Sequence, residues 1–161
     1  MDLIASILNR DQVEILPADP DSPDARACLD AYFTELAARV SGIGPGKFTD
    51  PDAEAYRPPR GRMLLAWSDE LPIGCVSLRL LDGKTAEVKR LWVAGHARGQ
   101  GLSRRLMQAI EAEARGMGMT SLKLDTHSAL TEAVSLYRAS GWRDIPPYTG
   151  LPADTWLAKV L

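Results

Sequence analysis

The segment from Glu87 to Ser103, EVKRLWVAGHARGQGLS, combines residue types that suit the binding of a phosphate group. Its pattern predicts a strand, then a loop with glycines, then an amphipathic helix. The first turn of a helix has unpaired backbone N–H groups and the positive end of the helix dipole. Gly99 and Gly101 let successive amides point into one concavity, and Arg98 adds a charged, planar donor fork. The segment therefore predicts a phosphate site made mostly of main chain.

Two glycines before a helix are weak evidence alone, because a tight strand-to-helix turn with an exposed arginine has the same residues. The segment lacks the G-x-x-x-x-G-K-[ST] pattern of a Walker loop. It also lacks the G-x-G-x-x-G fingerprint of dinucleotide-binding proteins, because Ser103 follows the second glycine instead. A second motif further along the chain, AVSLYRASGW from Ala133 to Trp142, adds specificity.

Together the two segments resemble the hallmarks of the GNAT (general N-acetyltransferase) superfamily. The strand, the R-x-x-G-x-small loop at Arg98–Ser103 and the helix after it resemble the first hallmark. Ala133–Trp142 resembles the second, A-x-x-L-Y-x-x-x-G-aromatic. The resemblance implies acyl transfer, above all of acetyl, from acetyl-CoA to a primary amine of a small molecule or peptide, by direct attack in a ternary complex. The alternative is a non-catalytic acyl-CoA-binding module of the same fold.

The resemblance also assigns roles to residues of this sequence. The strand that pairs with the pantetheine arm matches Leu91, Trp92 and Val93. The pyrophosphate loop and first helical turn match Arg98, Gly99, Gln100, Gly101, Leu102, Ser103 and Arg104. Tyr137 matches the tyrosine that lies near the cofactor sulfur.

The chain departs from the family pattern in two places. Ser103 replaces the usual Gly or Ala at the end of the loop, and it is small enough to be tolerated there. Leu130 stands where the family often has an asparagine that contacts the pantetheine. Three polar residues are candidates to replace that contact, and they remain open at this point: His127, Thr126 and Ser135.

Attack on the thioester needs a neutral amine, and an amine with a pKa of ~10.4 is about 99.9% protonated at pH 7. A base is therefore expected, and Glu87 is the candidate; the competing interpretation is a carboxylate paired with Lys89 or Arg79. A tyrosine with a pKa of ~10 is a weaker acid than a thiol with a pKa of ~8.5. We therefore expect Tyr137 to donate a hydrogen bond to the developing thiolate and to transfer its proton late.

The sequence says less about the acceptor side of the site, where the amine that receives the acyl group would bind. In a GNAT-like fold the first helix, the loop after it and the last hairpin surround the amine, which indicates Tyr32, Glu35, the Gly42–Arg60 loop and Tyr148. Cys28 and Cys75 are far apart and lie in apolar patterns, so they are expected to be structural, reduced thiols. No residue spacing supports a metal site.

The elements that position these residues follow from periodicity. Expected strands are Gln12–Leu16, Met63–Trp67, Ile73–Leu81, Ala86–Val93, Ser121–Thr126, Trp142–Ile145 and Thr155–Val160. Helices are expected after Ser22, after Gly101 and around Leu130–Gly141, with a helical turn near Asp52–Tyr56. This order predicts an α/β domain with a mixed sheet rather than a doubly wound parallel one. The resemblance implies a GNAT-like, mostly antiparallel sheet of about six to seven strands with helices on both faces. The resemblance adds a splayed parallel pair, Ala86–Val93 and Ser121–Thr126.

The length, charge and hydropathy of the chain limit the kinds of partner that it is expected to bind. A chain of 161 residues suits one domain over residues 1–161, with residues 1–10 as a flexible or helical extension. The net charge of −2 and the lack of basic runs argue against nucleic acid. No apolar stretch predicts a membrane span and Met1–Arg10 lacks signal-peptide features, so a cytoplasmic protein is expected. The resemblance also allows for a homodimer.

Overall fold

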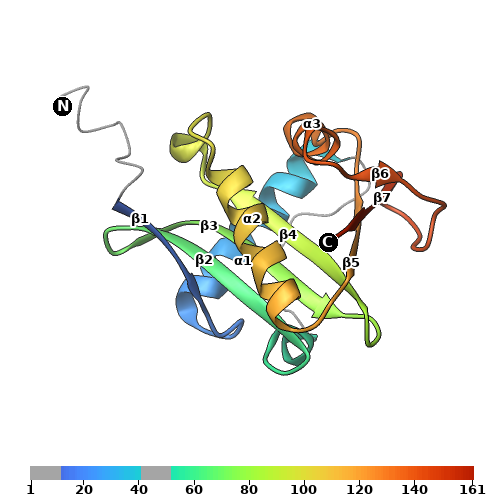
Figure 1. The fold of residues 1–161 in the computed structure, drawn as a ribbon. Coiled ribbons are helices and arrows are strands. Elements are labelled where there is room, and N and C mark those ends of the chain that lie inside the picture. Colours follow the sequence, from blue (N-terminus) through green and yellow to red (C-terminus); the bar gives the residue numbers. More distant parts are fainter. Residues whose placement is uncertain (1–11, 41–51) are drawn as a thin grey trace.

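The computed structural model describes residues 12–40 and 52–161 of the chain. Seven strands form one sheet in the order β1-β2-β3-β4-β5-β7-β6 (Figure 1). They are β1 (Val13–Pro17), β2 (Gly61–Ser68), β3 (Leu71–Leu80), β4 (Thr85–Val93), β5 (Ser121–Thr126), β6 (Arg143–Asp144) and β7 (Thr155–Val160). Neighbouring strands are antiparallel except β4 and β5. The mixed, mostly antiparallel sheet with one parallel pair confirms the predicted fold class.

Within the described residues, three helices and two short 3₁₀ turns accompany the sheet: α1 (Pro23–Arg39), α2 (Leu102–Gly116), α3 (Thr131–Ala139), η3 (Ala53–Tyr56) and η4 (Gly95–Ala97). The cap predicted at Ser22 is present, since its side chain accepts a hydrogen bond from the Ala25 N–H at 3.3 Å and Pro23 occupies the first helical turn. The predicted N-terminal extension, residues 1–10, and the first part of the Gly42–Arg60 loop lie outside the described residues.

The helices lie on both faces of the sheet because the strand residues alternate between two cores. On β2, Met63 and Leu65 pack with the buried residues of α1, including Cys28. Their neighbours Leu64 and Ala66 face the opposite way, into the larger core that holds the buried side of α2. Figure 1 shows α1 behind the sheet and α2 in front of it. We call these the α1 face and the α2 face.

The parallel pair opens soon after it forms. β4 and β5 are in register only from Thr85 to Glu87, although both strands run on well past that point. The register between β3 and β4 also shifts, and Arg90 within β4 has a φ of 60°. A bulge of this kind bends the strand and increases its twist. The splayed pair is therefore built into β4, and it leaves an opening between the C-terminal halves of β4 and β5.

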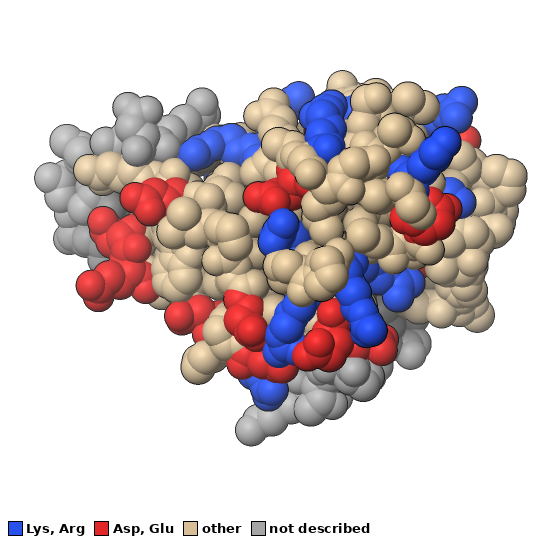
Figure 2. Space-filling model, turned by 60° about the horizontal axis from the view of Figure 1, so that its bottom comes forward, with Lys and Arg blue, Asp and Glu red and all other residues tan. Residues whose placement is uncertain are grey.

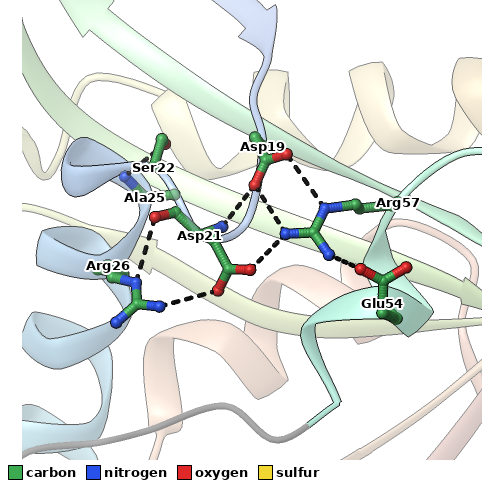
Figure 3. Close-up of polar contacts among 7 residues, drawn as sticks. All are labelled: Asp19, Asp21, Ser22, Ala25, Arg26, Glu54 and Arg57. Atoms are coloured by element: carbon green, nitrogen blue, oxygen red, sulfur yellow. Dashed lines mark hydrogen bonds and ion pairs between the residues drawn. The ribbon is translucent and has the colours of Figure 1, made fainter.

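An ion-pair cluster fixes the segment before β2 to the start of α1 (Figure 3). The Arg57 guanidinium donates to both oxygens of Asp19 at 3.1 Å and also contacts Asp21 and Glu54. The side-chain hydrogen bonds from Arg57 hold the pKa of Asp19 and Asp21 below the usual value. These carboxylates therefore stay ionised at neutral pH. Acidic and basic side chains lie interspersed on the face shown in Figure 2, which is typical of such local pairing.

Candidate active site

A cavity of about 410 Å³ opens between α1, the end of β4, the N-terminus of α2 and α3. We call it the α1–α3 cavity. It brings together all but one of the residues predicted to bind the cofactor, since only Gln100 is absent from its wall. The residues present are Leu91, Trp92, Val93, Arg98, Gly99, Gly101, Leu102, Ser103 and Arg104. Two segments of the predicted site, one strand and one loop, thus share a single hollow.

The loop before α2 has the backbone conformation that its glycines favour. Gly99 has a φ of 77° and Gly101 a φ of 79°, in the left-handed region that is costly for other residues. Gly101 is the N-cap of α2 and supplies no side-chain cap, so the amides of the first turn have no side-chain acceptor from the cap. That first turn contains Arg104 and no acidic residue. The start of α2 therefore offers N–H donors and positive charge to an anion.

The end of β4 presents an unused backbone edge. Trp92 pairs with Cys75 and Val93 with Gly74 on the β3 side, while the pairing with β5 ends at Glu87. The β5 side of this end of β4 therefore lacks a strand partner within the described sheet, although the Val93 carbonyl there accepts a hydrogen bond from the Arg98 side chain. An extended ligand can add there in the manner of a further strand.

A chain of four charged side chains crosses the rim of the α1–α3 cavity. Arg98 donates to both oxygens of Glu35 at 2.5 and 2.6 Å and to the Val93 carbonyl at 3.0 Å. Glu35 lies 3.5 Å from Arg39, which donates to Glu132 at 2.8 Å. Glu35 is a predicted residue of the acceptor side, but in the structure its carboxylate accepts hydrogen bonds from Arg98. Arg39 and Glu132 were not predicted, because 93 residues separate them and no local pattern relates them.

Tyr137 is not one of the residues that line the α1–α3 cavity. It is 6% exposed and packs against Trp142, with ring centroids 5.9 Å apart, while its neighbours Ala133 and Leu136 line the cavity. Its hydroxyl has no hydrogen-bond partner among the described residues. Burial raises the pKa of Tyr137, with a smaller contribution from Tyr32, which lines the cavity. The phenol is therefore protonated and has its hydrogen free to donate.

Glu87 is fully buried and does not line the α1–α3 cavity. Its Oε1 accepts a hydrogen bond from Arg79 Nε at 2.7 Å and lies 3.7 Å from Lys89 Nζ. Its Oε2 accepts a hydrogen bond from the Tyr148 hydroxyl at 2.7 Å. Arg79 and Lys89, the two cations of the alternative interpretation in which Glu87 is only an ion-pair partner, are thus next to this carboxylate. Tyr148 was a candidate for the acceptor side, but its contact with Glu87 was not predicted.

The remaining candidates are distributed as follows. Tyr32 lines the α1–α3 cavity, and so does Leu130, at the position of the missing asparagine. None of the three polar candidates for that contact lines it, namely Thr126, His127 and Ser135. The contact predicted for the asparagine is therefore replaced here by an apolar wall.

The two cysteines are buried on the α1 face, at 2% exposure for Cys28 and 0% for Cys75. The hydrogen bond between the two thiols, and then burial, raise the pKa of Cys75, which also donates to the Arg90 carbonyl at 3.4 Å. The same hydrogen bond lowers the pKa of Cys28. A buried, protonated thiol such as Cys75 is a poor nucleophile. Within residues 12–40 and 52–161, no cluster of three metal-ligating side chains occurs. No helix in those ranges has the length and apolarity to span a membrane.

Comparisons with known proteins agree with this geometry. Residues 20–142 match the model of the Acetyltransferase (GNAT) family. An IAA acetyltransferase of Azospirillum brasilense is 35% identical over 114 residues, which cover 68% of this chain and 74% of the relative. An uncharacterized N-acetyltransferase of Schizosaccharomyces pombe is 36% identical over 135 residues, covering 83% and 82%. A GNAT family acetyltransferase from Elizabethkingia anophelis, solved with acetyl-CoA bound, has 20% identity and a TM-score of 0.68, covering 94% of this chain and all of that one.

Proposed function

This chain belongs to the GNAT acetyltransferase family, and on that premise we propose that it transfers acetyl from acetyl-CoA to a primary amine of a small molecule or peptide. The observation that carries the proposal is the α1–α3 cavity, where the free edge of β4 and the glycine loop of α2 meet. The bound acetyl-CoA of the Elizabethkingia structure supports the same choice of donor.

The proposed reaction is direct attack in a ternary complex. The amine nitrogen forms a bond to the thioester carbonyl carbon, and the carbon–sulfur bond breaks. The nitrogen loses one proton to a base, and the departing sulfur receives a hydrogen bond and then a proton. Backbone groups of Trp92 and Val93 and the first turn of α2 hold the donor in place, which lowers the entropic part of the barrier.

Two measurements test this proposal. Acetyl-CoA is expected to raise the melting temperature, because a ligand that binds only the native state stabilises it. A panel of primary amines is then assayed for acetyl-CoA-dependent thiol release. Stabilisation without release for any amine would favour the non-catalytic module, and no stabilisation would count against both functions.

Glu87 is proposed as the final acceptor of the amine proton, reached through Tyr148, which covers Oε2. In such a relay the Tyr148 oxygen takes the amine proton while its own proton moves to Glu87. Glu87→Gln is expected to lower kcat/KM about tenfold, less than the roughly hundredfold or more usual for acid–base groups, because Arg79 pairs with the carboxylate. The measurement is kcat/KM with the best amine of the panel, in the variant and in the parent protein.

Tyr148→Phe separates this role from a structural one. If the relay operates, this variant lowers kcat/KM as much as Glu87→Gln does, while the Arg79–Glu87 pair survives. Full activity in Tyr148→Phe together with a lower melting temperature in Glu87→Gln would leave Glu87 only as a structural partner of Arg79.

Glu35 is expected to compete with the pyrophosphate for Arg98, since both of its oxygens already accept from that guanidinium. Glu35→Gln removes the competing charge and is expected to tighten acetyl-CoA binding about three- to fivefold, as partly exposed ion pairs contribute little. Calorimetry at low and at high salt measures the change, which is expected to shrink as salt screens the charges. Weaker binding in Glu35→Gln would instead mean that Glu35 holds Arg98 in its binding position.

A further inference from the structure

A second hollow, of about 460 Å³, lies over β5, β7 and β6 beside the segment that follows β6. We call it the β5–β7 groove. Ile145, Pro146, Pro147 and Tyr148 form one wall. Its floor includes Lys123, which stands in register with Ala158 of β7, and Ala158 stands in register with Arg143 of β6.

The groove lies on the α1 face of the sheet. Along β5, Leu122 and Leu124 point into the core of the α2 face, so Lys123 between them points the other way. Lys123 is also in register with Glu87 of β4. Directly opposite residues share a face, so the groove and the Glu87 carboxylate lie on the same side of the sheet.

Of the three cations that line the groove, Lys159 pairs with Glu111 at 2.7 Å, whereas Lys123 and Arg143 have no ion pair among the described residues. Arg143 is exposed, and the Lys123 ammonium lies 5.4 Å from the centre of the Tyr148 ring. No carboxylate lines the groove. The nearest acid in sequence, Asp144, is held by Arg138 at 2.6 Å. Two cations beside proline and aliphatic walls suit a ligand with an anionic group and an apolar body.

Tyr148 connects the groove with the proposed reaction site. Its ring lines the groove, and its hydroxyl donates to Glu87. The next residue, Thr149, donates to Asp125 at 2.7 Å, and Asp125 lies two residues beyond Lys123 on β5. This segment thus spans from the groove to the opening between β4 and β5.

We propose that the β5–β7 groove binds the anionic group of the acceptor, so that the substrate is an amine that also bears a carboxylate. This inference rests on the proposed acetyl transfer to a primary amine. Asp125, on the half of β5 that has splayed away from β4, lies two residues beyond Lys123, which corresponds to roughly 7 Å at the usual rise of a strand. An amine at that opening and a carboxylate at Lys123 are therefore separated by a spacer of that order. Amines with a second positive charge are disfavoured, because Lys123 and Arg143 repel them.

The experiment compares ω-amino acids from glycine to 6-aminohexanoate with the n-alkylamine and the diamine of the same carbon number. At the best chain length, kcat/KM for thiol release is expected to be at least tenfold higher with the amino acid than with the alkylamine. A difference of that size is usual for the gain of a hydrogen bond to a charged group. That length is expected at about four to six carbons, which span the estimated distance. The diamine is expected to be the poorest substrate of each set.

Arg143→Gln tests the site itself, because Arg143 is exposed and its loss leaves the core intact. The variant is expected to lose most of the preference for the amino acid while its rate with the alkylamine stays unchanged. The matched control is Arg138→Gln, which removes a neighbouring arginine that pairs with Asp144 and does not line the groove. Its preference is expected to equal that of the parent protein.

Calorimetry of 5-aminopentanoate with the CoA-saturated protein gives a second measurement that does not need turnover. Binding that is lost in Arg143→Gln, without thiol release from any amine, would support the groove and refute the transferase function. Turnover with no advantage for the carboxylate, or an advantage that survives in Arg143→Gln, would overturn the groove and leave the transferase function standing. The absence of both binding and turnover would overturn the groove proposal and the transferase function together.

Discussion

Replacing Gly101 with alanine is expected to weaken acetyl-CoA binding about thirtyfold, which corresponds to about 2 kcal/mol. Gly101 has a φ of 79°, which costs a residue with a Cβ atom about 1–2 kcal/mol of folding stability. The loss of affinity comes from the new methyl group, which would project beside the amides of the first turn of α2, where the backbone is expected to approach the pyrophosphate. Calorimetric titration with acetyl-CoA measures the affinity.

Gly118→Ala is the matched control. Gly118 follows the other end of α2, has a φ of 82°, and, as at Gly101, a Cβ there would meet nothing within 4 Å. Both variants are therefore expected to lower the melting temperature to a similar extent. Only Gly101→Ala is expected to lose affinity for acetyl-CoA. An equal loss in Gly118→Ala would mean that strain in α2, and not the position of Gly101, weakens binding.

Local patterns predicted most of the fold. The strands at Ser121–Thr126 and Thr155–Val160 have the predicted bounds, because alternation with period two depends only on near neighbours. The strand expected at Trp142–Ile145 is shorter: Arg143 and Asp144 are in register with β7, and Ile145 adds one hydrogen bond from its N–H to the Trp156 carbonyl. Trp142 points into the core instead, and the two prolines that follow have no N–H to donate to a sheet.

The candidate site could be proposed from sequence where its parts are contiguous. Leu91–Val93 and Arg98–Arg104 belong to one strand–loop–helix unit, so a local motif was enough to predict a cofactor-binding role for them, and that role stays a prediction. The contacts that join distant segments were not predictable. Glu35 meets Arg98 across 63 residues, and Tyr148 meets Glu87 across 61. Such pairs arise only when the sheet brings its strands together, and a charged or aromatic residue in a loop gives no sign of its partner.

Tyr137 was identified by its motif, and its surroundings define what it can contribute. A tyrosine at its ordinary pKa of ~10 already transfers its proton to a thiolate of pKa ~8.5 at a cost of about 2 kcal/mol. Burial raises the pKa of Tyr137 further, which makes full transfer costlier still. A hydrogen bond to the charge that develops on sulfur needs no such transfer. The Tyr137 hydroxyl has no partner among the described residues and can therefore take that role.

Tyr137→Phe is therefore expected to lower kcat about a hundredfold, as for the loss of one donor to a developing negative charge. The affinity for acetyl-CoA is expected to stay unchanged. The melting temperature is expected to hold or rise, because the lost hydroxyl has no partner among the described residues. The pH profile of kcat is expected to keep its shape, since the raised pKa keeps Tyr137 protonated throughout.

These measurements distinguish a donor from a packing residue. A residue that only packs against Trp142 would change stability or cofactor affinity and leave kcat intact, because phenylalanine keeps the ring. A normal kcat in Tyr137→Phe would therefore remove the proposed role. A loss of kcat with an altered pH profile would mean that Tyr137 acts by exchanging its proton, which its burial opposes. Only a loss of kcat at constant affinity, stability and pH profile fits a fixed hydrogen bond to the leaving sulfur.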